Sequence, residues 1–579
     1  MKKLAIMLLP FAAMAAVAGE LSLDGSWEFR FEEGKAHDEA VDPRFEATDS
    51  IPVPGCFDAM PKWFMKRGTG LYRRTFSLDR AADRAWLRVD GAGLYARFWV
   101  DGREIGVDDL PWSRVEIATG PLAAGEHVLF AAVDNRFDWR YQKLVRTYYD
   151  FHCWGGFFRG VSLVFDNRRL HVRTRDFATG TVEIEAVDFP DMAGDAAREL
   201  VFDGRNRVRA AFRNGRATVK VPGFRLWSPE APNLHRVALG GVSTRFGIRT
   251  VEAKNRGIYL NGRRIFLKGA NRHDQHWQFG AATPESQMIA DIQLLKQMGG
   301  NFFRGAHYPQ SQRFLDLCDE NGVLVWEESL GWGNGQGYTM QNGVNETTDP
   351  DFIDAQLRET KLMVRNSFNH PSVIIFAFLN EFASWSAEAQ PLASNLVAAV
   401  RAADSGRLVT FACNAGGDDR ANALTDLISI NTYPGVINSP PGVTAELKEK
   451  IRNQQGFGLY EQVRALRAKH PEKTIIVSEM GAPGVYGARD VSAPFASEDF
   501  QAEYVGLVAD AAYENPDLAG IAFWQFFDTR TCWRDCGNDG KKSLAKSDCG
   551  LFDRFRRPKA AVAALAARFR DRTPANLKQ

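Results

Sequence analysis

Residues 373–381 read Val-Ile-Ile-Phe-Ala-Phe-Leu-Asn-Glu, an apolar run that ends in an amide and a carboxylate. A glutamate after so apolar a strand must lie at the rim of a sheet, because burying it unpaired would be costly. Residues 474–479, Thr-Ile-Ile-Val-Ser-Glu, repeat this form. Both stretches lie in the half of the chain after residue 253, where short apolar runs alternate with helical segments. This alternation predicts parallel β/α units.

Eight apolar runs in this half are predicted as strands. Helical segments separate most of them; residues 284–298, for example, begin with Pro-Glu and stop at Gly299-Gly300. Eight such units over about 250 residues or more predict a (β/α)8 (TIM) barrel. The predicted strands are residues 265–270, 301–306, 323–328, 373–379, 408–413, 427–432, 474–478 and 520–526.

The preceding half of the chain has a different pattern. Short runs there alternate apolar and polar residues, and turn signals such as Asp101-Gly102 and Asn214-Gly215 separate them. This pattern is typical of β-sandwiches. We therefore predict a multidomain chain with a jelly-roll β-sandwich over residues 19–168, an immunoglobulin-like β-sandwich over 169–252 and the catalytic barrel over 253–579.

The first eighteen residues have the pattern of a targeting segment. Lys2 and Lys3 precede an apolar stretch, residues 4–17, and Ala16-Val17-Ala18 fits a small-x-small cleavage site. The stretch is too short to span a bilayer. We expect residues 1–18 to be a cleaved signal peptide and the protein to be periplasmic or secreted, without a membrane span. The alternative is a buried N-terminal helix.

The balance of charged residues indicates which classes of partner the protein does not bind. The chain of 579 residues carries 72 basic and 71 acidic residues, so it lacks the positive charge expected of a nucleic-acid-binding or membrane-surface protein. The seven cysteines are an odd count, so in an oxidising compartment at least one stays free or pairs between chains. Cys532, Cys536 and Cys549 cluster, which favours a disulfide among them over a zinc site, because no paired C-x-x-C motif is present.

Polar and titratable side chains follow most of the predicted barrel strands. Barrel active sites form at this end of the strands. The residues at these positions are Asn271, Arg272, His273 and Asp274 after the first strand, His307 and Tyr308 after the second, Asn380 and Glu381 after the fourth, Tyr433 after the sixth, Glu479 after the seventh and Trp524 on the eighth.

Glu381 and Glu479 are the candidate catalytic pair. Glycoside hydrolysis needs one protonated and one ionised carboxyl group, and a separation of about 5–5.5 Å gives retention through a glycosyl-enzyme. The fourth and seventh strands lie on opposite sides of a barrel mouth, so these side chains can converge. Arg304, at the end of the second strand, is a candidate to keep Glu479 ionised, with a rim ion pair as the alternative. The residues alone do not assign the two roles, and a structural salt bridge stays open for either glutamate.

Four motifs of the barrel resemble glycoside hydrolase family 2, which contains β-galactosidases, β-glucuronidases and β-mannosidases. They are Asn380-Glu381, Ser478-Glu479, Gly269-Ala-Asn-Arg-His273 and Arg304-Gly-Ala-His-Tyr-Pro309. The resemblance covers nearly the whole mature chain, including the order of sandwich, immunoglobulin-like domain and barrel. It implies that Glu381 is the acid/base, that Glu479 is the nucleophile, that Asn380 holds the sugar 2-hydroxyl and that Tyr433 supports the nucleophile.

The resemblance also extends to the first domain. Residues 150–159, Asp-Phe-His-Cys-Trp-Gly-Gly-Phe-Phe-Arg, are similar to a segment whose aspartate reaches into the barrel to bind sugar hydroxyls, so Asp150 is expected to bind substrate; a loop-capping role is the alternative. His307 and Trp524 are expected to line the sugar subsite, although Trp524 fits a core position almost as well. Asn271 and His273 are expected to order the site rather than to touch the sugar.

The sugar is predicted from a departure from the family pattern. Family glucuronidases commonly read the uronate with Asn-x-Lys before a Gly-[Ile/Leu]-Phe turn, whereas this chain has Ser547-Asp548-Cys549 before Gly550-Leu551-Phe552. We therefore expect a retaining exo-β-glycosidase that acts on β-D-galactosides. The alternatives are a β-glucuronidase or β-galacturonidase, for which Lys542, Lys546, Arg554 and Arg556 are the candidate substitute cations, and an inactive carbohydrate-binding protein.

The two-carboxylate mechanism needs no metal. We expect no metal and no cofactor, a glycoside as the only partner, and either a monomer or a homo-oligomer.

Overall fold

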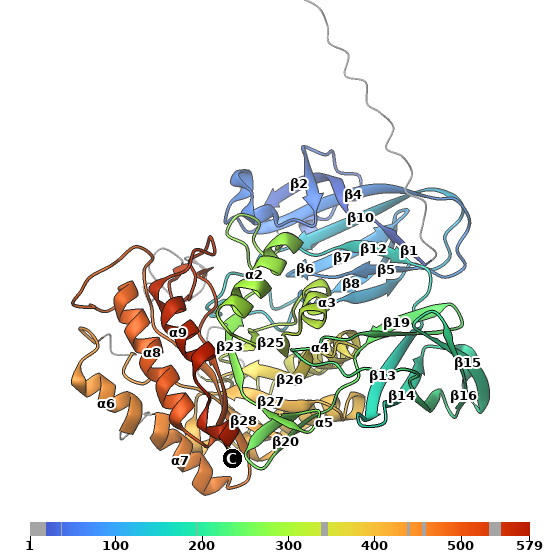
Figure 1. Cartoon of the computed structure of the whole chain (residues 1–579). Coiled ribbons are helices and arrows are strands. Elements are labelled where there is room, and N and C mark those ends of the chain that lie inside the picture. Colours follow the sequence, from blue (N-terminus) through green and yellow to red (C-terminus); the bar gives the residue numbers. More distant parts are fainter. Residues whose placement is uncertain are drawn as a thin grey trace, which may run out of the picture.

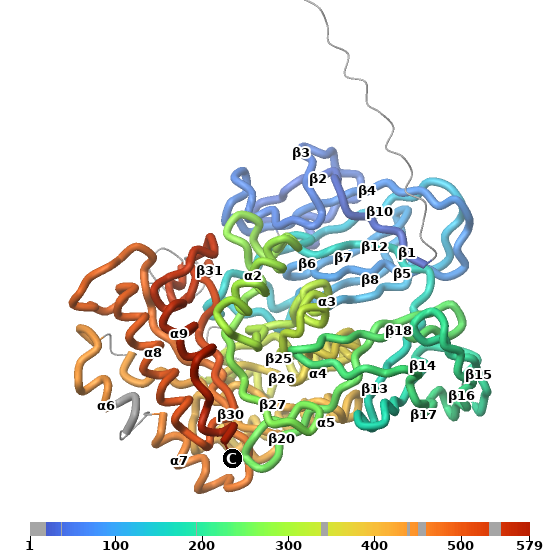
Figure 2. The backbone as a smooth tube through the Cα atoms, in the orientation of Figure 1, coloured from blue at the N-terminus to red at the C-terminus, as the bar shows by residue number. Residues whose placement is uncertain are grey.

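The computed structural model describes residues 19–578 apart from residues 36, 193, 337–344, 437–439, 454–458 and 532–545. The predicted signal peptide, Cys532, Cys536 and Lys542 therefore lie outside the described residues. Figure 1 shows two β-rich regions beside a barrel, with the first region, in blue, above the barrel and the second, in green, to its right. The backbone tube in Figure 2 has the same arrangement.

The first region is a β-sandwich. One sheet has the strand order β3-β2-β4-β10-β7-β8 and faces another of order β1-β12-β5-β9. Alternate side chains of β2 and β7 are buried, and they pack with Phe157 and Leu163 in one apolar core. The bounds are β1 Glu20–Ser22, β2 Gly25–Glu33, β3 Asp49–Val53, β4 Gly68–Leu78, β5 Trp86–Val89, β7 Tyr95–Val100, β8 Arg103–Asp108, β9 Val115–Ala118, β10 Gly125–Asp134 and β12 Val161–Val164. The Asp101-Gly102 turn joins β7 to β8, as predicted.

The second region is a smaller sandwich with its own core. Its sheets have the orders β13-β14-β17 and β16-β15-β18-β19, and their inner faces share an apolar cluster that includes Leu200 and Phe246. The bounds are β13 Arg169–Asp176, β14 Thr181–Val187, β15 Ala196–Phe202, β16 Asn206–Phe212, β17 Arg216–Lys220, β18 His235–Leu239 and β19 Val242–Phe246. The predicted boundary near residue 168 falls between β12 and β13.

The third region is the predicted barrel. Within the described ranges, β23 to β30 pair in parallel and close on themselves in sequence order. The strands are β23 Leu267–Arg272, β24 Phe302–Gly305, β25 Leu324–Trp332, β26 Val373–Asn380, β27 Leu408–Cys413, β28 Leu427–Asn431, β29 Thr474–Met480 and β30 Leu518–Phe523. All eight residues of β26 are buried, because helices cover the outside of the barrel and side chains fill its interior.

Helices cover the outside of the barrel. Two of them begin with a matched cap: Asp349 accepts a hydrogen bond from the Phe352 amide at the start of α4, and Ser497 accepts one from the Phe500 amide at the start of α8. The helices are α2 Glu285–Gln297, α3 Gln312–Asn321, α4 Pro350–Ser367, α5 Gln390–Ala403, α6 Ala445–Asn453, α7 Leu459–Lys469, α8 Glu498–Glu514 and α9 Ala560–Asp571. Every helix in the described part of the chain is too short or too polar to cross a lipid bilayer.

Several barrel strands begin or end at other residues than predicted, and three of these differences bear on the site. The first begins at Leu267 because Arg263–Ile265 form β22, which pairs antiparallel with β21 (Gly257–Leu260). The third strand is longer than predicted, since β25 continues to Trp332. The eighth strand ends at Phe523, so Trp524 follows it instead of lying within it.

A segment of the first sandwich packs on the barrel. Leu144, Tyr149 and Phe151, which follow β10, share one apolar cluster with the barrel residues Phe303 and Tyr308. Because this segment and the barrel bury one another's apolar surface, residues of the first sandwich reach the end of the barrel where the catalytic residues are expected.

Candidate active site

Glu381 and Glu479 lie in one hydrogen-bonded network at the C-terminal end of the barrel strands. Glu381 follows β26 directly, and Glu479 is the next-to-last residue of β29. Arg304 on β24 donates to Glu479 Oε1 at 2.6 Å and to Asn380 Oδ1 at 2.9 Å. Asn431 on β28 donates to Asn380 Oδ1 at 3.0 Å and to Glu381 Oε1 at 2.7 Å. The two carboxyl groups are therefore linked through three shared side chains.

The Glu479 carboxylate has donors on both oxygens. Besides Arg304, the Tyr433 hydroxyl donates to Oε2 at 2.8 Å, and His307 Nε2 lies 3.9 Å from Oε1. Glu479 is only 4% exposed. The Glu479 carboxylate therefore accepts one charge-assisted hydrogen bond from a guanidinium and one from a phenol hydroxyl.

Arg304 is held in place by a second carboxylate. Its fully buried guanidinium bonds Glu328 through Nε and Nη2, both at 3.0 Å, and Nη1 also donates to Asn271 Oδ1 at 2.8 Å. Burial opposes ionisation of Glu328, but Arg304 and His307 outweigh it and lower the pKa of this carboxyl. Glu328 therefore holds the planar guanidinium group of Arg304 in place, and Nη1 of this group donates to Glu479.

The Glu381 carboxyl has neutral hydrogen-bond partners. Its partners are the amides of Asn431 on Oε1 and Asn414 on Oε2, the latter at 3.2 Å. Burial raises the pKa of Glu381 to about 8, and the negative charges of Glu479 and Asp150 add to the rise. Glu381 therefore holds its proton at neutral pH and is suited to act as an acid.

The backbone at the end of β26 is strained. Leu379 and Glu381 have φ angles of 48° and 49°, in the left-handed region that residues with a side chain rarely adopt. The Glu381 amide still donates to Ala412 O on β27 at 2.9 Å, so the neighbouring strand holds this conformation. Strain of this kind costs about 1–3 kcal/mol per residue and persists where the surroundings over-determine it. Here it turns Glu381 out of the strand pleat and places its carboxyl beside Asn431.

Asn380 presents an unused donor. Its Oδ1 accepts from Arg304 and Asn431, while its buried Nδ2 has no acceptor among the described residues. A buried N–H without an acceptor is costly, so this atom is ready to bind an incoming hydroxyl. The substrate contact of Asn380 stays a prediction, and Nδ2 is the atom that would make it.

Aromatic and imidazole rings form a wall beside Glu479. Trp524 stacks on His307 with ring centroids 5.2 Å apart, and it meets His273 edge-on at 5.4 Å. Phe151 of the first sandwich contacts both histidines, at 5.3 and 6.0 Å. Trp524 is 7% exposed, so most of its surface serves packing and a single edge is available to a ligand.

The remaining predicted residues are near the site. Asp150 lies close enough to Glu381 to raise its pKa. Asn271 donates to the main-chain oxygens of Ser478 and Phe523, which ties the ends of β29 and β30 together. His273 Nδ1 lies 3.2 Å from the Tyr308 hydroxyl. Asn271 and His273 therefore contact protein groups that shape the site, as expected for supporting residues.

Three residues of the network were not singled out from the sequence. Asn414 and Asn431 stand at the ends of the fifth and sixth strands, where the strand-end rule applies to them as it does to Asn380. Glu328 is the last residue of the predicted third strand, residues 323–328, so the same rule applies to it, although the structure continues β25 to Trp332. Only the position of Arg304 on the adjacent strand shows what Glu328 does.

The candidate substitute cations are mostly neutralised. Lys546 pairs with Asp548 at 2.6 Å, and Arg556 pairs with the buried Asp291 at 3.0 Å. Cys549, at the position where family glucuronidases carry the lysine, is near enough to Tyr433 to contribute to its raised pKa, after burial and the two catalytic carboxylates. Position 549 thus adjoins the site but carries no cation.

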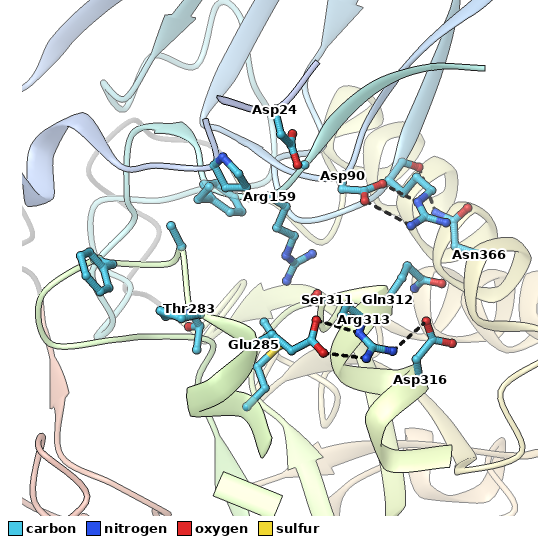
Figure 3. Close-up of a pocket in the computed structure, with 18 of the residues that line it drawn as sticks. Asp24, Asp90, Arg159, Thr283, Glu285, Ser311, Gln312, Arg313, Asp316 and Asn366 are labelled. Carbon is cyan, nitrogen blue, oxygen red and sulfur yellow. Dashed lines mark hydrogen bonds and ion pairs between the residues drawn. The ribbon is translucent and has the colours of Figure 1, made fainter. Parts of the chain in front are cut away.

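A cavity of about 960 Å³ lies away from this site. It lies between the first sandwich, the second sandwich and the start of α2 and α3, and Figure 3 shows Asp24, Arg159 and Glu285 among its lining residues. Arg313 pairs there with Glu285 at 2.7 Å. It also contains Asp316, Asp319 and His370, whose ligand atoms lie within 4.8 Å of one another.

These three side chains already bond to the protein. His370 Nδ1 lies 2.6 Å from Asp319 Oδ2, the Ser372 amide donates to Asp319 Oδ1, and Arg245 pairs with Asp316. All three side chains of this cluster therefore have protein partners.

Comparisons with known proteins identify the barrel. Residues 251–571 match the family model described as glycosyl hydrolases family 2, TIM barrel domain. The chain is 25% identical over 615 residues to a β-glucuronidase of Canis lupus familiaris, with 94% of this chain and 90% of that protein covered. It is 29% identical to a β-galactosidase of Vibrio cholerae, but that match covers 62% of this chain and 40% of the relative.

A solved structure of the same family is similar to nearly the whole chain. A GH2 β-galacturonidase from Eisenbergiella tayi, bound to galacturonate, superposes with a TM-score of 0.78 and 26% sequence identity. The superposition covers 96% of this chain and 98% of that one. The similarity therefore includes both sandwiches as well as the barrel.

Proposed function

The chain belongs to glycoside hydrolase family 2, and from that premise we propose that it is a retaining exo-β-glycosidase that removes a terminal β-linked uronic acid. That the protein is a glycoside hydrolase follows from the family. The proposal adds the stereochemistry, the residue roles and the class of sugar.

One observation carries the mechanism: the two carboxyl groups of a single network have opposite environments. Burial and the nearby negative charges raise the pKa of Glu381 to about 8, while Glu479 is bonded by Arg304 and Tyr433. One group therefore holds a proton while the other is stabilised as an anion. These are the two states that a retaining glycosidase needs before its first step.

The reaction then proceeds in two displacements. In the first, Glu479 attacks the anomeric carbon, the glycosidic bond breaks, and Glu381 gives its proton to the departing oxygen. In the second, the Glu381 carboxylate takes a proton from water, whose oxygen displaces Glu479 and restores both groups. The free Nδ2 of Asn380 donates to a hydroxyl of the sugar, and Tyr433 releases Glu479 Oε2 as the ester forms.

The relatives support a uronic acid over galactose. The β-glucuronidase and β-galacturonidase relatives align along nearly their whole length, whereas the β-galactosidase match covers less than half of that protein. More than half of that β-galactosidase therefore lies outside the region that aligns with this chain. This preference for a uronide replaces the galactoside that we expect from the sequence.

A galactoside remains the second candidate on one observation. Cys549, rather than lysine, stands beside Tyr433, so the cation that family glucuronidases use at this position is missing. If a uronide is the substrate, another group must bind its carboxylate.

A panel of 4-nitrophenyl glycosides separates these candidates. The panel contains the β-galacturonide, β-glucuronide, β-galactoside, β-mannoside and β-glucoside. We expect the highest kcat/KM on one of the two uronides, and NMR of the first product to show the β-anomer. A highest value on the galactoside would replace the uronide proposal, and an initial α-anomer would exclude retention. No turnover with any member, despite a folded protein, would favour the inactive carbohydrate-binding alternative.

We also propose that the protein is exported and loses residues 1–18. The support is the Lys2-Lys3 start, the apolar stretch that follows and the Ala16-Val17-Ala18 site. N-terminal sequencing of the protein from a bacterial periplasm is expected to begin at Gly19. A chain that keeps Met1 would contradict export by cleavage.

A further inference from the structure

A second cavity, of about 340 Å³, opens at the same end of the barrel as the catalytic residues. Its lining includes Gln275, two residues beyond His273, and Arg530, six residues beyond Trp524. The Arg530 amide donates to Gln275 Oε1, which joins the two walls. Trp154 of the first sandwich, four residues beyond Asp150, lines it as well. All three walls thus continue directly from residues of the candidate active site.

Of the four arginines that line this cavity, two have an acidic partner among the described residues and two do not. Arg556 and Arg557 have acidic partners in Asp291 and Asp553. Arg530 and Arg554 line the same cavity, yet neither forms an ion pair with any residue that the structure describes. Each guanidinium lies over an aromatic ring instead, Arg530 over Phe64 at 4.9 Å and Arg554 over Phe555 at 4.8 Å.

The charges of Arg530 and Arg554 act on one another. Burial lowers the pKa of Arg530, the charge of Arg554 lowers it further, and the charge of Asp58 opposes this shift, so the two guanidinium groups are close enough to interact. Two like charges that share a cavity are unfavourable unless an anion joins them. A bound carboxylate or sulfate would relieve this repulsion and accept hydrogen bonds from both forks.

The rest of the lining suits a sugar ring. Trp277, Tyr486 and Phe555 are 46%, 39% and 41% exposed, which is high for aromatic side chains that line one cavity. Exposed aromatic faces stack on the apolar faces of sugars. Arg554 lies over Phe555 and Arg557 over Tyr486, which leaves Trp277 as the ring that can stack on a sugar. In addition, Trp154 is 2% exposed, and its Nε1–H has no acceptor among the described residues. This donor needs a partner, which a sugar oxygen can supply.

We propose that this cavity is a subsite for a negatively charged sugar residue on the leaving-group side of the substrate. The natural substrate is then an acidic oligosaccharide with at least two charged residues, rather than a uronide of a small neutral alcohol. This inference rests on the proposed function, since it assigns the cavity to the same substrate chain. The charge on the second sugar is a carboxylate or a sulfate, because both fit a pair of guanidinium groups.

Binding to a catalytically silent chain tests the subsite separately from catalysis. The double variant Glu381→Gln/Glu479→Gln is titrated by calorimetry with three tetrasaccharides of the same β-1,4 linkage: a tetraglucuronate, a sulfated cellotetraose and neutral cellotetraose. We expect at least one acidic tetrasaccharide to bind more tightly than the neutral one. Adding Arg530→Gln and Arg554→Gln is expected to weaken acidic binding about tenfold or more, because charge-assisted hydrogen bonds are lost. The acidic tetrasaccharide that binds more tightly identifies the charged group.

Two controls make the result decisive. Arg209 is an exposed arginine on β16 of the second sandwich, so adding Arg209→Gln instead should leave all affinities unchanged. Arg554 is exposed, so the single Arg554→Gln change should keep the melting temperature and still weaken acidic binding. Equal affinity for acidic and neutral tetrasaccharides, or acidic binding that survives loss of both arginines, would overturn the proposal. Because no turnover is measured, these outcomes stay distinct from a failure of the uronide panel.

Discussion

The two sides of the catalytic network use opposite chemistry to hold the same kind of group. On the side of β24 and β29, Glu479 meets a guanidinium and a phenol hydroxyl. On the side of β26 and β28, Glu381 meets the neutral amides of Asn431 and Asn414. Both carboxyl groups are hydrogen-bonded, so the comparison teaches that hydrogen bonding alone does not decide the protonation state: burial and nearby negative charges raise the pKa of Glu381, whereas a cation bonds Glu479. Changes on either side therefore test the comparison directly.

The largest effect is expected on the charged side. Glu479→Gln removes the nucleophile, so kcat on an activated aryl β-glycoside should fall on the order of 10⁴-fold or more. Circular dichroism and the melting temperature should show an intact fold. The matched control is Glu472→Gln, at a side chain that is 82% exposed, with wild-type turnover expected. Unchanged turnover in Glu479→Gln would refute the nucleophile assignment.

The next largest effect is expected at Arg304. Arg304→Met leaves Glu328 and Glu479 buried without their cation, which should cost about 3–5 kcal/mol of stability and most of the activity. Arg304→Lys keeps the charge but loses the fork, so it should recover stability more than kcat. Urea unfolding and kcat are measured on both variants. Equal stability of Arg304→Met and the wild type would show that the network does not depend on this cation.

Tyr433→Phe tests the second donor to Glu479. Removal of the hydroxyl deletes the 2.8 Å bond to Oε2 while the ring stays in place. A hydrogen bond to a charged group contributes about 1.5–3 kcal/mol, so kcat/KM should fall roughly 10- to 150-fold. The melting temperature serves as the control for packing. A loss below about twofold would assign Tyr433 to packing instead of support of the nucleophile.

The pH profile tests the neutral side. With the pKa of Glu381 at about 8, kcat/KM should fall tenfold per pH unit above about pH 8, as the acid loses its proton. In Glu381→Gln this basic limb should disappear along with most of the rate on substrates with poor leaving groups. A wild-type profile that is flat to pH 9, or a limb that survives in Glu381→Gln, would assign the acid role elsewhere.

The same shift has a consequence for stability. The folded protein keeps a proton on Glu381 that the unfolded chain releases near its ordinary pKa of 4.5. The stabilising contribution of this group is therefore complete below pH 4.5 and is lost as the pH rises to about 8. The melting temperature of Glu381→Gln should exceed that of the wild type at pH 8, and this difference should shrink at pH 5.

The smallest expected effect is at Asn431. Its hydrogen bond lowers the pKa of Glu381 and so opposes the larger effect of burial. Asn431→Ala should therefore move the basic limb of kcat/KM to higher pH, by less than one unit. Asn414→Ala, which removes the longer 3.2 Å bond to Oε2, should move it less. A limb that moves to lower pH in Asn431→Ala would contradict the role of this amide.

The sequence predicts the barrel and most of the network for one reason: polar residues after apolar runs must gather at one end of a parallel barrel. This rule places Glu381, Glu479, Asn380 and Tyr433 together. The rule also applies to Glu328, the last residue of the predicted third strand, but it does not reveal that this carboxylate is buried within β25 and paired with Arg304 on the neighbouring strand. The sugar was harder to predict, because specificity depends on side chains from several loops and from the first sandwich.

The packing of the first sandwich on the barrel has a consequence for how such chains can be divided. Trp112 stacks on Tyr308 with centroids 4.6 Å apart, and Arg159 pairs with Asp274 at 3.0 Å in a buried contact. An isolated barrel would expose this apolar surface and remove one of the two arginines that pair with the buried Asp274, the other being Arg272. We therefore expect that the barrel cannot be produced alone in soluble form. A chimeric protein should fold only if its first sandwich and its barrel come from the same protein.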